Sequence, residues 1–298
     1  MTSGKVRAGE LLRRCVPPSL KARVPVWLKA WARTELLGEP WPDLAIRHPL
    51  FRTADYKSLR KAATPFDGFR KPYKPPIERG HQASYFVARW FAEAGVKSVF
   101  HAGYSNGRYL FYLRQKGIDC GGTDLALAEA PENEVPAGLF EERILRRLLR
   151  VDFFELRVDH LRPTWGELPI DTLFTEATFE TLVPWRKQGF SVLKYRTARP
   201  EVRHELLYER LPAKLSELRE CFRNIVFIEP EPGAGGAGEV FDQCARRLAD
   251  LEYSVWRFRP PFDQLFRLSP SEPTTQAVYA YTRDSAWLSP LRPYCDRL

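Results

Sequence analysis

A glycine-rich turn between two apolar segments carries the residue types that point most directly to chemistry. Residues 96–102 read as a strand, Gly103 and Gly107 fall in the bend that follows, and residues 107–116 read as a helix. Glycines at such a bend let a ligand approach the backbone closely, because they carry no Cβ. Asp124 follows the last of these glycines by 17 residues, at the end of the next expected strand. A carboxylate there can accept hydrogen bonds from two ribose hydroxyls. The pattern therefore predicts a site for an adenosine-containing ligand.

The spacing of the turn separates the classes of adenosine site. A dinucleotide fingerprint requires G-x-G-x-x-G, whereas Gly103-x-Ser105-x-Gly107 lacks its third glycine, and no phosphate-binding G-K-[ST] sequence occurs in the chain. The segment instead resembles motif I of the class I S-adenosylmethionine-dependent methyltransferases, an acidic-x-G-x-G-x-G turn. Ser105 stands in the place of the middle glycine and His101 in the acidic position. The resemblance covers roughly residues 81–285.

The elements around the turn follow the plan of that family. From residue 81 onward, expected helices and strands alternate, which is typical of a parallel sheet covered on both faces. Strands are expected at residues 96–102, 118–123, 149–153, 170–175, 224–229, 253–258 and 276–282. The resemblance implies a seven-stranded, mostly parallel Rossmann-like sheet in the order 3-2-1-4-5-7-6, with strand 7 antiparallel and helices on both faces.

The resemblance also implies which residues bind S-adenosylmethionine. The turn would receive the methionine part, Asp124 would bind the ribose, and Asp152 with Phe153 would contact the adenine. Thr175 lies at the carboxyl end of the fourth strand, where open α/β sheets bind ligands. The full predicted set is His101, Gly103, Tyr104, Ser105, Gly107, Asp124, Leu125, Asp152, Phe153 and Thr175. The structural alternatives are a core imidazole for His101, a loop carboxylate for Asp152 and a core ring for Phe153.

Methyl transfer asks little covalent chemistry of a protein, because the sulfonium methyl is already electrophilic and alignment supplies much of the rate. A hydroxyl acceptor also needs its proton removed by a general base or a metal. We expect the catalytic residues to be His81, before the first strand, Glu176, after the fourth, and His204, further along the chain. The alternatives are a helix-terminal carboxylate for Glu176 and surface or capping histidines for the other two. No cluster of side chains has convincing metal-ligand spacing, so we expect catalysis without a metal.

Composition narrows the class of protein. The chain has 298 residues, of which 44% are apolar and 28% charged, and no apolar run approaches the roughly 20 residues that span a bilayer. Five scattered cysteines without a C-x-x-C pair argue against a disulfide framework and a structural zinc site, so we expect a cytoplasmic protein. The net charge of +9 is compatible with an acidic partner. Because no RNA-binding motif accompanies it, we do not expect nucleic acid as the partner.

The first 80 residues differ from the rest, so we predict an extension at 1–80 and a methyltransferase domain at 81–298. The extension contains short basic amphipathic stretches interrupted by prolines. Such stretches pack on the domain, pack on a second subunit of a homodimer, or contact a membrane surface peripherally. Residues 64–76 are rich in proline and aromatic residues, which predicts an ordered loop that covers the ligand.

The predicted function is S-adenosylmethionine-dependent methylation, first of all O-methylation of a small molecule or saccharide, such as a natural product or a polysaccharide precursor. One alternative is methylation of RNA or protein, which only the positive charge supports. Residues 175–178 read TEAT, where many base N-methyltransferases carry N-P-P-[YF]. The other alternative is a non-catalytic methyltransferase-like partner subunit, which His101 and Ser105 in motif I suggest.

Overall fold

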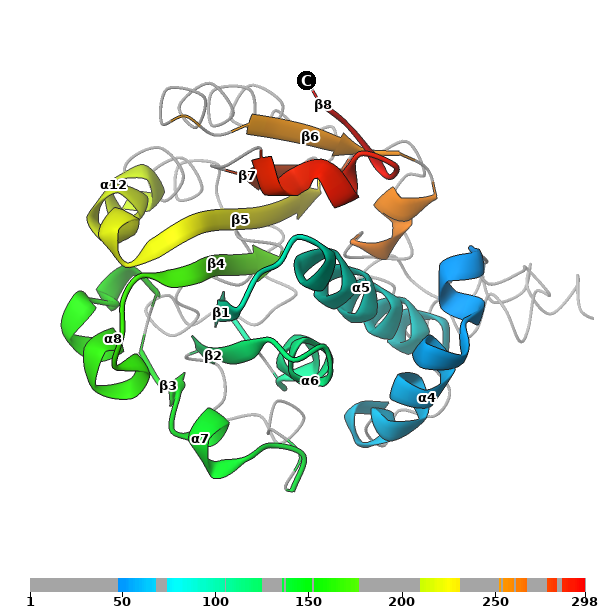
Figure 1. The fold of residues 1–298 in the computed structure, drawn as a ribbon, viewed down its shortest axis with the longest axis horizontal. Coiled ribbons are helices and arrows are strands. Elements are labelled where there is room, and N and C mark those ends of the chain that lie inside the picture. The colour runs from blue at the N-terminus through cyan, green and yellow to red at the C-terminus, as the bar shows by residue number, and fades with distance from the viewer. Residues whose placement is uncertain are drawn as a thin grey trace, which may run out of the picture.

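The fold was obtained as a computed structural model. It describes residues 48–67, 74–104, 106–124, 136, 138–151, 153–176, 210–230, 252, 254–259, 261–266, 278–282 and 286–297. These residues form an α/β sheet with helices packed against both of its faces (Figure 1).

The described strands form a single sheet in the order β3-β2-β1-β4-β5-β7-β6-β8. They are β1 (Ser98–Ala102), β2 (Asp119–Thr123), β3 (Leu148–Leu149), β4 (Ile170–Glu176), β5 (Phe222–Pro230), β6 (Ser254–Phe258), β7 (Val278–Thr282) and β8 (Cys295–Arg297). Strands β3, β2, β1, β4 and β5 pair in parallel, which confirms the predicted parallel α/β sheet. Strand β7 runs antiparallel to its neighbours β5 and β6, and β8 pairs antiparallel with β6.

Two strands differ from the sequence-based expectation. The third strand consists of Leu148–Leu149 instead of 149–153, because the chain turns into a 3-10 segment at Phe153–Glu155. The eighth strand, Cys295–Arg297, was not predicted. It has three residues, of which two are exposed and charged, so it carries too little alternation of apolar and polar residues to be recognised as a strand.

The helices divide between the two faces. They are α4 (Ala54–Ala62), α5 (Lys74–Glu93), α6 (Arg108–Gln115), α7 (Glu142–Leu145), α8 (Val158–Trp165) and α12 (Leu211–Glu217). Figure 1 shows α8 and α12 on one side of the sheet and α5, α6 and α4 on the other. Side chains alternate between the faces of a strand. In β1, accordingly, Val99 joins the hydrophobic cluster under α5 and α6, whereas Phe100 joins the cluster under α8.

Helix α5 is longer than expected. It begins at Lys74, whereas the sequence predicted a helix from residue 81. Pro75 and Pro76 occupy its first turn, where the missing proline N–H has no partner to lose, and in the sequence they looked like part of a loop. The expected boundary between residues 80 and 81 therefore falls inside one continuous helix.

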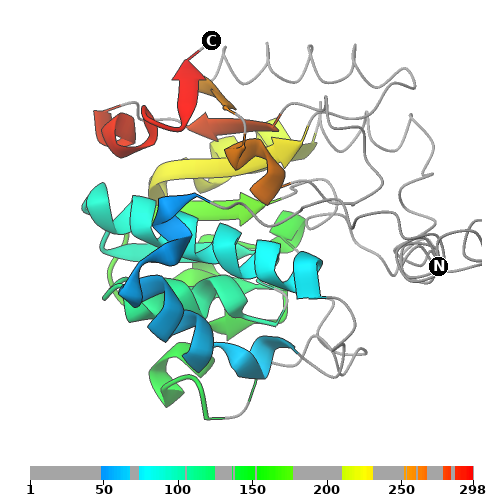
Figure 2. The same ribbon diagram turned by 90° about the vertical axis from the view of Figure 1, so that its right-hand side faces the viewer.

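Helices α5 and α6 both begin at the carboxyl end of the sheet. The C-terminus of α5 leads through a short connection into the start of β1, so α5 runs antiparallel to that strand. Helix α6 follows the end of β1 after a turn of a few residues. The two helices lie side by side (Figures 1 and 2). Residues near Gly80 and Arg108 are thereby brought to the same end of the sheet as the glycine turn.

The described part of the N-terminal extension packs on this face. A 3-10 segment (Pro49–Arg52), helix α4 and a second 3-10 segment (Thr64–Asp67) contribute to the hydrophobic cluster shared with α5 and α6. Phe51 and Tyr56 contact the ring of Tyr85 in α5, with centroid distances of 6.4 and 5.0 Å. Within the described part of the chain, every helix is too short or too polar to cross a bilayer.

Candidate functional site

The turn after β1 has the backbone conformation that its glycines allow. Gly103 and Gly107 have φ angles of 78° and 81°, a left-handed region that residues with a Cβ rarely adopt. The N–H of Gly103 donates to the carbonyl of Thr123 at 2.7 Å, and the N–H of Gly107 donates to the carbonyl of Tyr104 at 2.8 Å. Ser105 lies outside the described residues. The turn is thus tied to the end of β2 and opens directly into α6.

Asp124 lies beside this turn. Strands β1 and β2 pair so that Ala102 is opposite Thr123, and Asp124 is the next residue along the chain. Its N–H donates to the carbonyl of Leu149 at 3.1 Å, which holds the end of β2 against β3. This is the placement that a ribose contact requires. The contact itself stays a prediction, and Leu125 lies outside the described residues.

The antiparallel β7 beside β5, the glycine turn after β1 and the carboxylate after β2 agree with what the resemblance to the class I S-adenosylmethionine-dependent methyltransferases implies.

Comparisons with known proteins add little beyond this. No family model matches the chain, and no curated protein matches it. Among solved structures, the plantazolicin methyltransferase BpumL in complex with SAH is 12% identical, with 86% of this chain and 97% of that chain covered and a TM-score of 0.34. Cofactor-bound Rv0187 from MTB is 12% identical, with 88% and 99% covered and a TM-score of 0.39. A 16S rRNA (adenine(1408)-N(1))-methyltransferase from Catenulisporales acidiphilia is 15% identical, with 65% and 91% covered and a TM-score of 0.37. These values are too low to carry an activity or a substrate over to this chain.

Gly122 is a residue that the sequence reasoning missed. A Cβ placed on it would lie 2.2 Å from the carbonyl oxygen of His101 and 3.1 Å from Cδ1 of Tyr104. The close approach of β1, β2 and the Tyr104 ring therefore requires a glycine at this position. The signal was present in the sequence, because a glycine inside a strand often marks a close backbone approach.

Tyr104 is buried next to Asp124. Its side chain is almost fully enclosed. Burial, together with the charge of Asp124, raises the pKa of the Tyr104 hydroxyl well above its usual value. The phenol is therefore neutral at physiological pH, and its ring lies close to the backbone of Gly122 in β2.

His101, in the acidic position of motif I, is enclosed in a ring of aromatic residues. Its side chain is 2% exposed, and its ring centroid lies 5.0 Å from that of Phe174 and 5.2 Å from that of Tyr109. Burial lowers the pKa of His101 to about 3, so the imidazole is neutral. Nδ1 has no hydrogen-bond partner among the described residues. The interpretation as a satisfied core imidazole therefore does not describe this nitrogen.

His81 is buried with both ring nitrogens occupied. Nδ1 lies 3.1 Å from the hydroxyl of Tyr112, and Nε2 lies 2.8 Å from Oδ1 of Asp67. Burial, assisted by the charges of Arg108 and Arg60, lowers the pKa of His81 far below its usual value. Nothing in these surroundings supports the expected role as a general base, which stays a prediction.

A network of charged groups extends from Asp67. Arg60 donates to Asp67 at 3.1 Å and to Glu78 at 2.9 Å, and the hydroxyl of Tyr56 donates to Glu78. These contacts join α4 and the segment Thr64–Asp67 to the first turns of α5. Sequence patterns did not reveal this network, because its members are far apart in the chain and become neighbours only when the helices pack.

The remaining expected site residues are only partly described. Phe153 is buried in the cluster that also contains Leu161 of α8, as a core residue would be. Thr175 is buried at the end of β4, and its hydroxyl has no hydrogen-bond partner among the described residues. The backbone of Glu176 ends β4. The Glu176 side chain, Ser105, Leu125, Asp152 and His204 lie outside the described residues.

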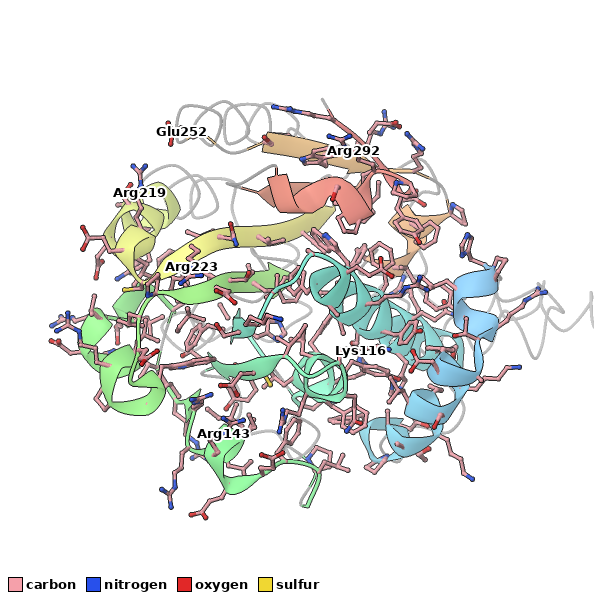
Figure 3. All side chains as sticks on the ribbon, viewed as in Figure 1. Lys116, Arg143, Arg219, Arg223, Glu252 and Arg292 are labelled. Atoms are coloured by element: carbon pink, nitrogen blue, oxygen red, sulfur yellow. The ribbon has the colours of Figure 1, made fainter. Side chains whose placement is uncertain are left out.

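Part of the basic stretch at residues 143–150 forms ion pairs and a stacking contact with other residues of the chain. Arg143 and Arg147 both pair with Asp119, and the guanidinium of Arg147 stacks on the Trp165 ring at 4.4 Å. Figure 3 shows Arg143 on the α7 side of the molecule. In the described part of the chain, no group of three or more His, Cys, Asp or Glu side chains could hold a metal ion.

Proposed function

We propose that the chain is an S-adenosylmethionine-dependent methyltransferase. The observation that carries this proposal is the pairing of β1 with β2, which sets the left-handed glycines of the turn beside Asp124 at the carboxyl end of the sheet. Gly103 and Gly107 leave the backbone of the turn open to close approach, and the Asp124 carboxylate can accept two hydroxyl donors. This combination fits an adenosine whose 5′ substituent carries no phosphate better than it fits a pyrophosphate.

The residues around the turn fit the cofactor. We infer that the turn receives its methionine part and that Asp124 binds its ribose. The unpartnered Nδ1 of His101 and the unpartnered hydroxyl of Thr175, both judged within the described residues, are polar atoms for which a bound polar ligand would provide partners. Their burial makes an unmade hydrogen bond costly. When bound, S-adenosylmethionine supplies an electrophilic methyl group. The protein then has to align the acceptor with it and exclude water.

For the acceptor we propose a small molecule or a saccharide, methylated on a hydroxyl. The segment TEAT at residues 175–178 lacks the sequence that base N-methyltransferases place after the fourth strand. Arg143, Arg146 and Arg147 are engaged with Asp119 and Glu142, which leaves fewer free cations for a phosphate backbone.

Glu176 is the base that we propose. Strand β4 lies between β1 and β5 and carries Glu176 to the carboxyl end of the sheet, opposite Ile228. His204 is the second candidate. The described cysteines, Cys120, Cys221 and Cys295, are buried and free, which suits a reducing cytoplasm as the proposed location.

Calorimetric titration with S-adenosylhomocysteine tests the proposal. Wild-type protein should bind it, and Asp124→Ala should bind at least tenfold more weakly, a loss of about 1.4 kcal/mol. Glu93→Ala is the matched control, because it also removes one carboxylate but lies at the C-terminal end of α5, away from the turn. If the wild-type protein binds neither S-adenosylmethionine nor S-adenosylhomocysteine, the proposed function is wrong. If the wild-type protein does bind them, its acceptor is sought by measuring methyl transfer from a labelled donor to sugars and other hydroxyl compounds.

A further inference from the structure

Arg108 extends a guanidinium group from the glycine turn onto helix α5. It is the first residue of α6, directly after Gly107, and its Nε donates to Oγ of Ser84 at 3.2 Å. A Cβ placed on Gly80 would lie 2.4 to 2.6 Å from Nη2, Cζ and Nη1 of Arg108. The guanidinium therefore rests on the α5 backbone in space that the absent side chain of Gly80 leaves open.

This cation has no acidic partner in the described part of the chain. Its side chain is half-buried, and no carboxylate of the described residues lies within ion-pair distance of it. Arg60 and Arg147, which are also partly buried, contact two carboxylates and one carboxylate respectively. A partly desolvated cation without a counter-ion is unfavourable, so its retention beside a ligand-binding turn points to a ligand that supplies the negative charge.

The position of Arg108 indicates which group of the proposed cofactor it contacts. The N-termini of α5 and α6 both lie at the carboxyl end of the sheet, so the guanidinium is next to the turn that we assign to the methionine part. S-adenosylmethionine carries a sulfonium, an ammonium and a carboxylate, and the carboxylate is its only anionic group. His101 is neutral, so the acidic position of motif I supplies no charge for the ammonium.

We propose that Arg108 binds the α-carboxylate of the cofactor and that this contact provides the main charge recognition of its amino-acid end. The inference rests on the proposed function. Ser84 and Gly80 orient the guanidinium, and its two-pronged geometry suits a carboxylate. In motif I of the family, an acidic residue of the protein would face the ammonium of the ligand. Here the guanidinium of Arg108 would instead face the carboxylate of the ligand.

The test compares two ligands within each protein variant. S-adenosylhomocysteine has the carboxylate, whereas its decarboxylated analogue, S-adenosyl-3-thiopropylamine, keeps the ammonium and lacks the carboxylate. Dissociation constants for both are measured by calorimetry on the wild-type protein, Arg108→Gln and Arg108→Lys. The matched control is Arg223→Gln, because Arg223 lies at the start of β5, at the amino end of the sheet (Figure 3), and pairs with Asp171 at 3.4 Å.

The wild-type protein and Arg223→Gln should prefer S-adenosylhomocysteine by roughly tenfold to hundredfold, the range for a hydrogen bond to a charged group. Arg108→Gln should bind both ligands equally, and Arg108→Lys should keep part of the preference. Because each preference is a ratio within one protein, a partly unfolded variant still gives a valid value, and Arg108→Lys serves if Arg108→Gln does not fold. An unchanged preference in Arg108→Gln, or no preference in the wild-type protein, overturns the inference while leaving the proposed function intact. Failure of the wild-type protein to bind either ligand overturns the proposed function itself.

Discussion

Replacing Gly122 with alanine should separate the two strands that hold the candidate site. The added Cβ would lie 2.2 Å from the carbonyl oxygen of His101, whereas an ordinary contact between carbon and oxygen needs more than about 3 Å. Strands β1 and β2 must therefore move apart by about 1 Å at this point. Overpacking of this kind costs about 1–3 kcal/mol. Weakening the neighbouring hydrogen bond from Gly103 to Thr123, 2.7 Å long in the native fold, costs about 1 kcal/mol more. We expect a total loss of about 3 kcal/mol in the free energy of unfolding.

The measurement is urea unfolding of Gly122→Ala beside Gly117→Ala. Gly117 has a φ of 77°, and a Cβ added to it would meet no atom within 4 Å, so alanine there bears only the cost of a left-handed backbone, about 1–2 kcal/mol. The two variants thus separate lack of space from backbone strain. Gly122→Ala should also bind S-adenosylhomocysteine more weakly, because the turn moves with β1. If Gly122→Ala is no less stable than Gly117→Ala, the reasoning about the contact between the strands is refuted.

Two further predictions concern buried charge. Because burial lowers the pKa of His101 to about 3, the unfolded chain takes up a proton near pH 6.5 that the folded chain refuses. The contribution of His101 to the free energy of unfolding should therefore be fully present above pH 6.5. As the pH decreases below 6.5, this contribution should fall by up to about 1.4 kcal/mol per pH unit. His101→Gln should show a smaller slope between pH 6.5 and 4.5 in urea unfolding at fixed pH, and equal slopes would contradict the assignment. Arg147→Gln should lower stability by about 2 kcal/mol, because it removes contacts with Asp119 and the Trp165 ring. Arg143→Gln, its exposed neighbour on the same carboxylate, should cost less than about 1 kcal/mol, and a larger loss there would reverse our ranking.

The parts of the fold that could be predicted are those with strong local patterns. Strands β1, β2, β4 and β5 are short segments bounded by turns and rich in buried residues, and each was placed within about two residues of its position. The short strands β3 and β8 were not, because strands of two and three residues are fixed by their neighbours in the sheet and leave little trace in the sequence.

The candidate site likewise has features that the sequence predicted and features that it could not predict. Spacing alone placed the glycine turn beside Asp124, because parallel pairing of consecutive strands brings their carboxyl ends together. The surroundings of His81 could not be predicted, since Asp67 and Tyr112 reach it from two other elements. The contact of Arg108 with Gly80 was missed for the same reason. It depends on how two helices pack, and neither residue has a distinctive local pattern.

The short outer strands affect how the molecule behaves towards its own copies. Strands β3 and β8 are the first and last in the described sheet, and an unpaired flank of a sheet can recruit strands from other chains. Here the two flanks consist of two and three residues, and β8 carries the exposed charges of Asp296 and Arg297. Two outer strands this short, one of them charged, disfavour sheet-to-sheet aggregation at the flanks of the described sheet, so concentrated protein should tolerate the titrations described above.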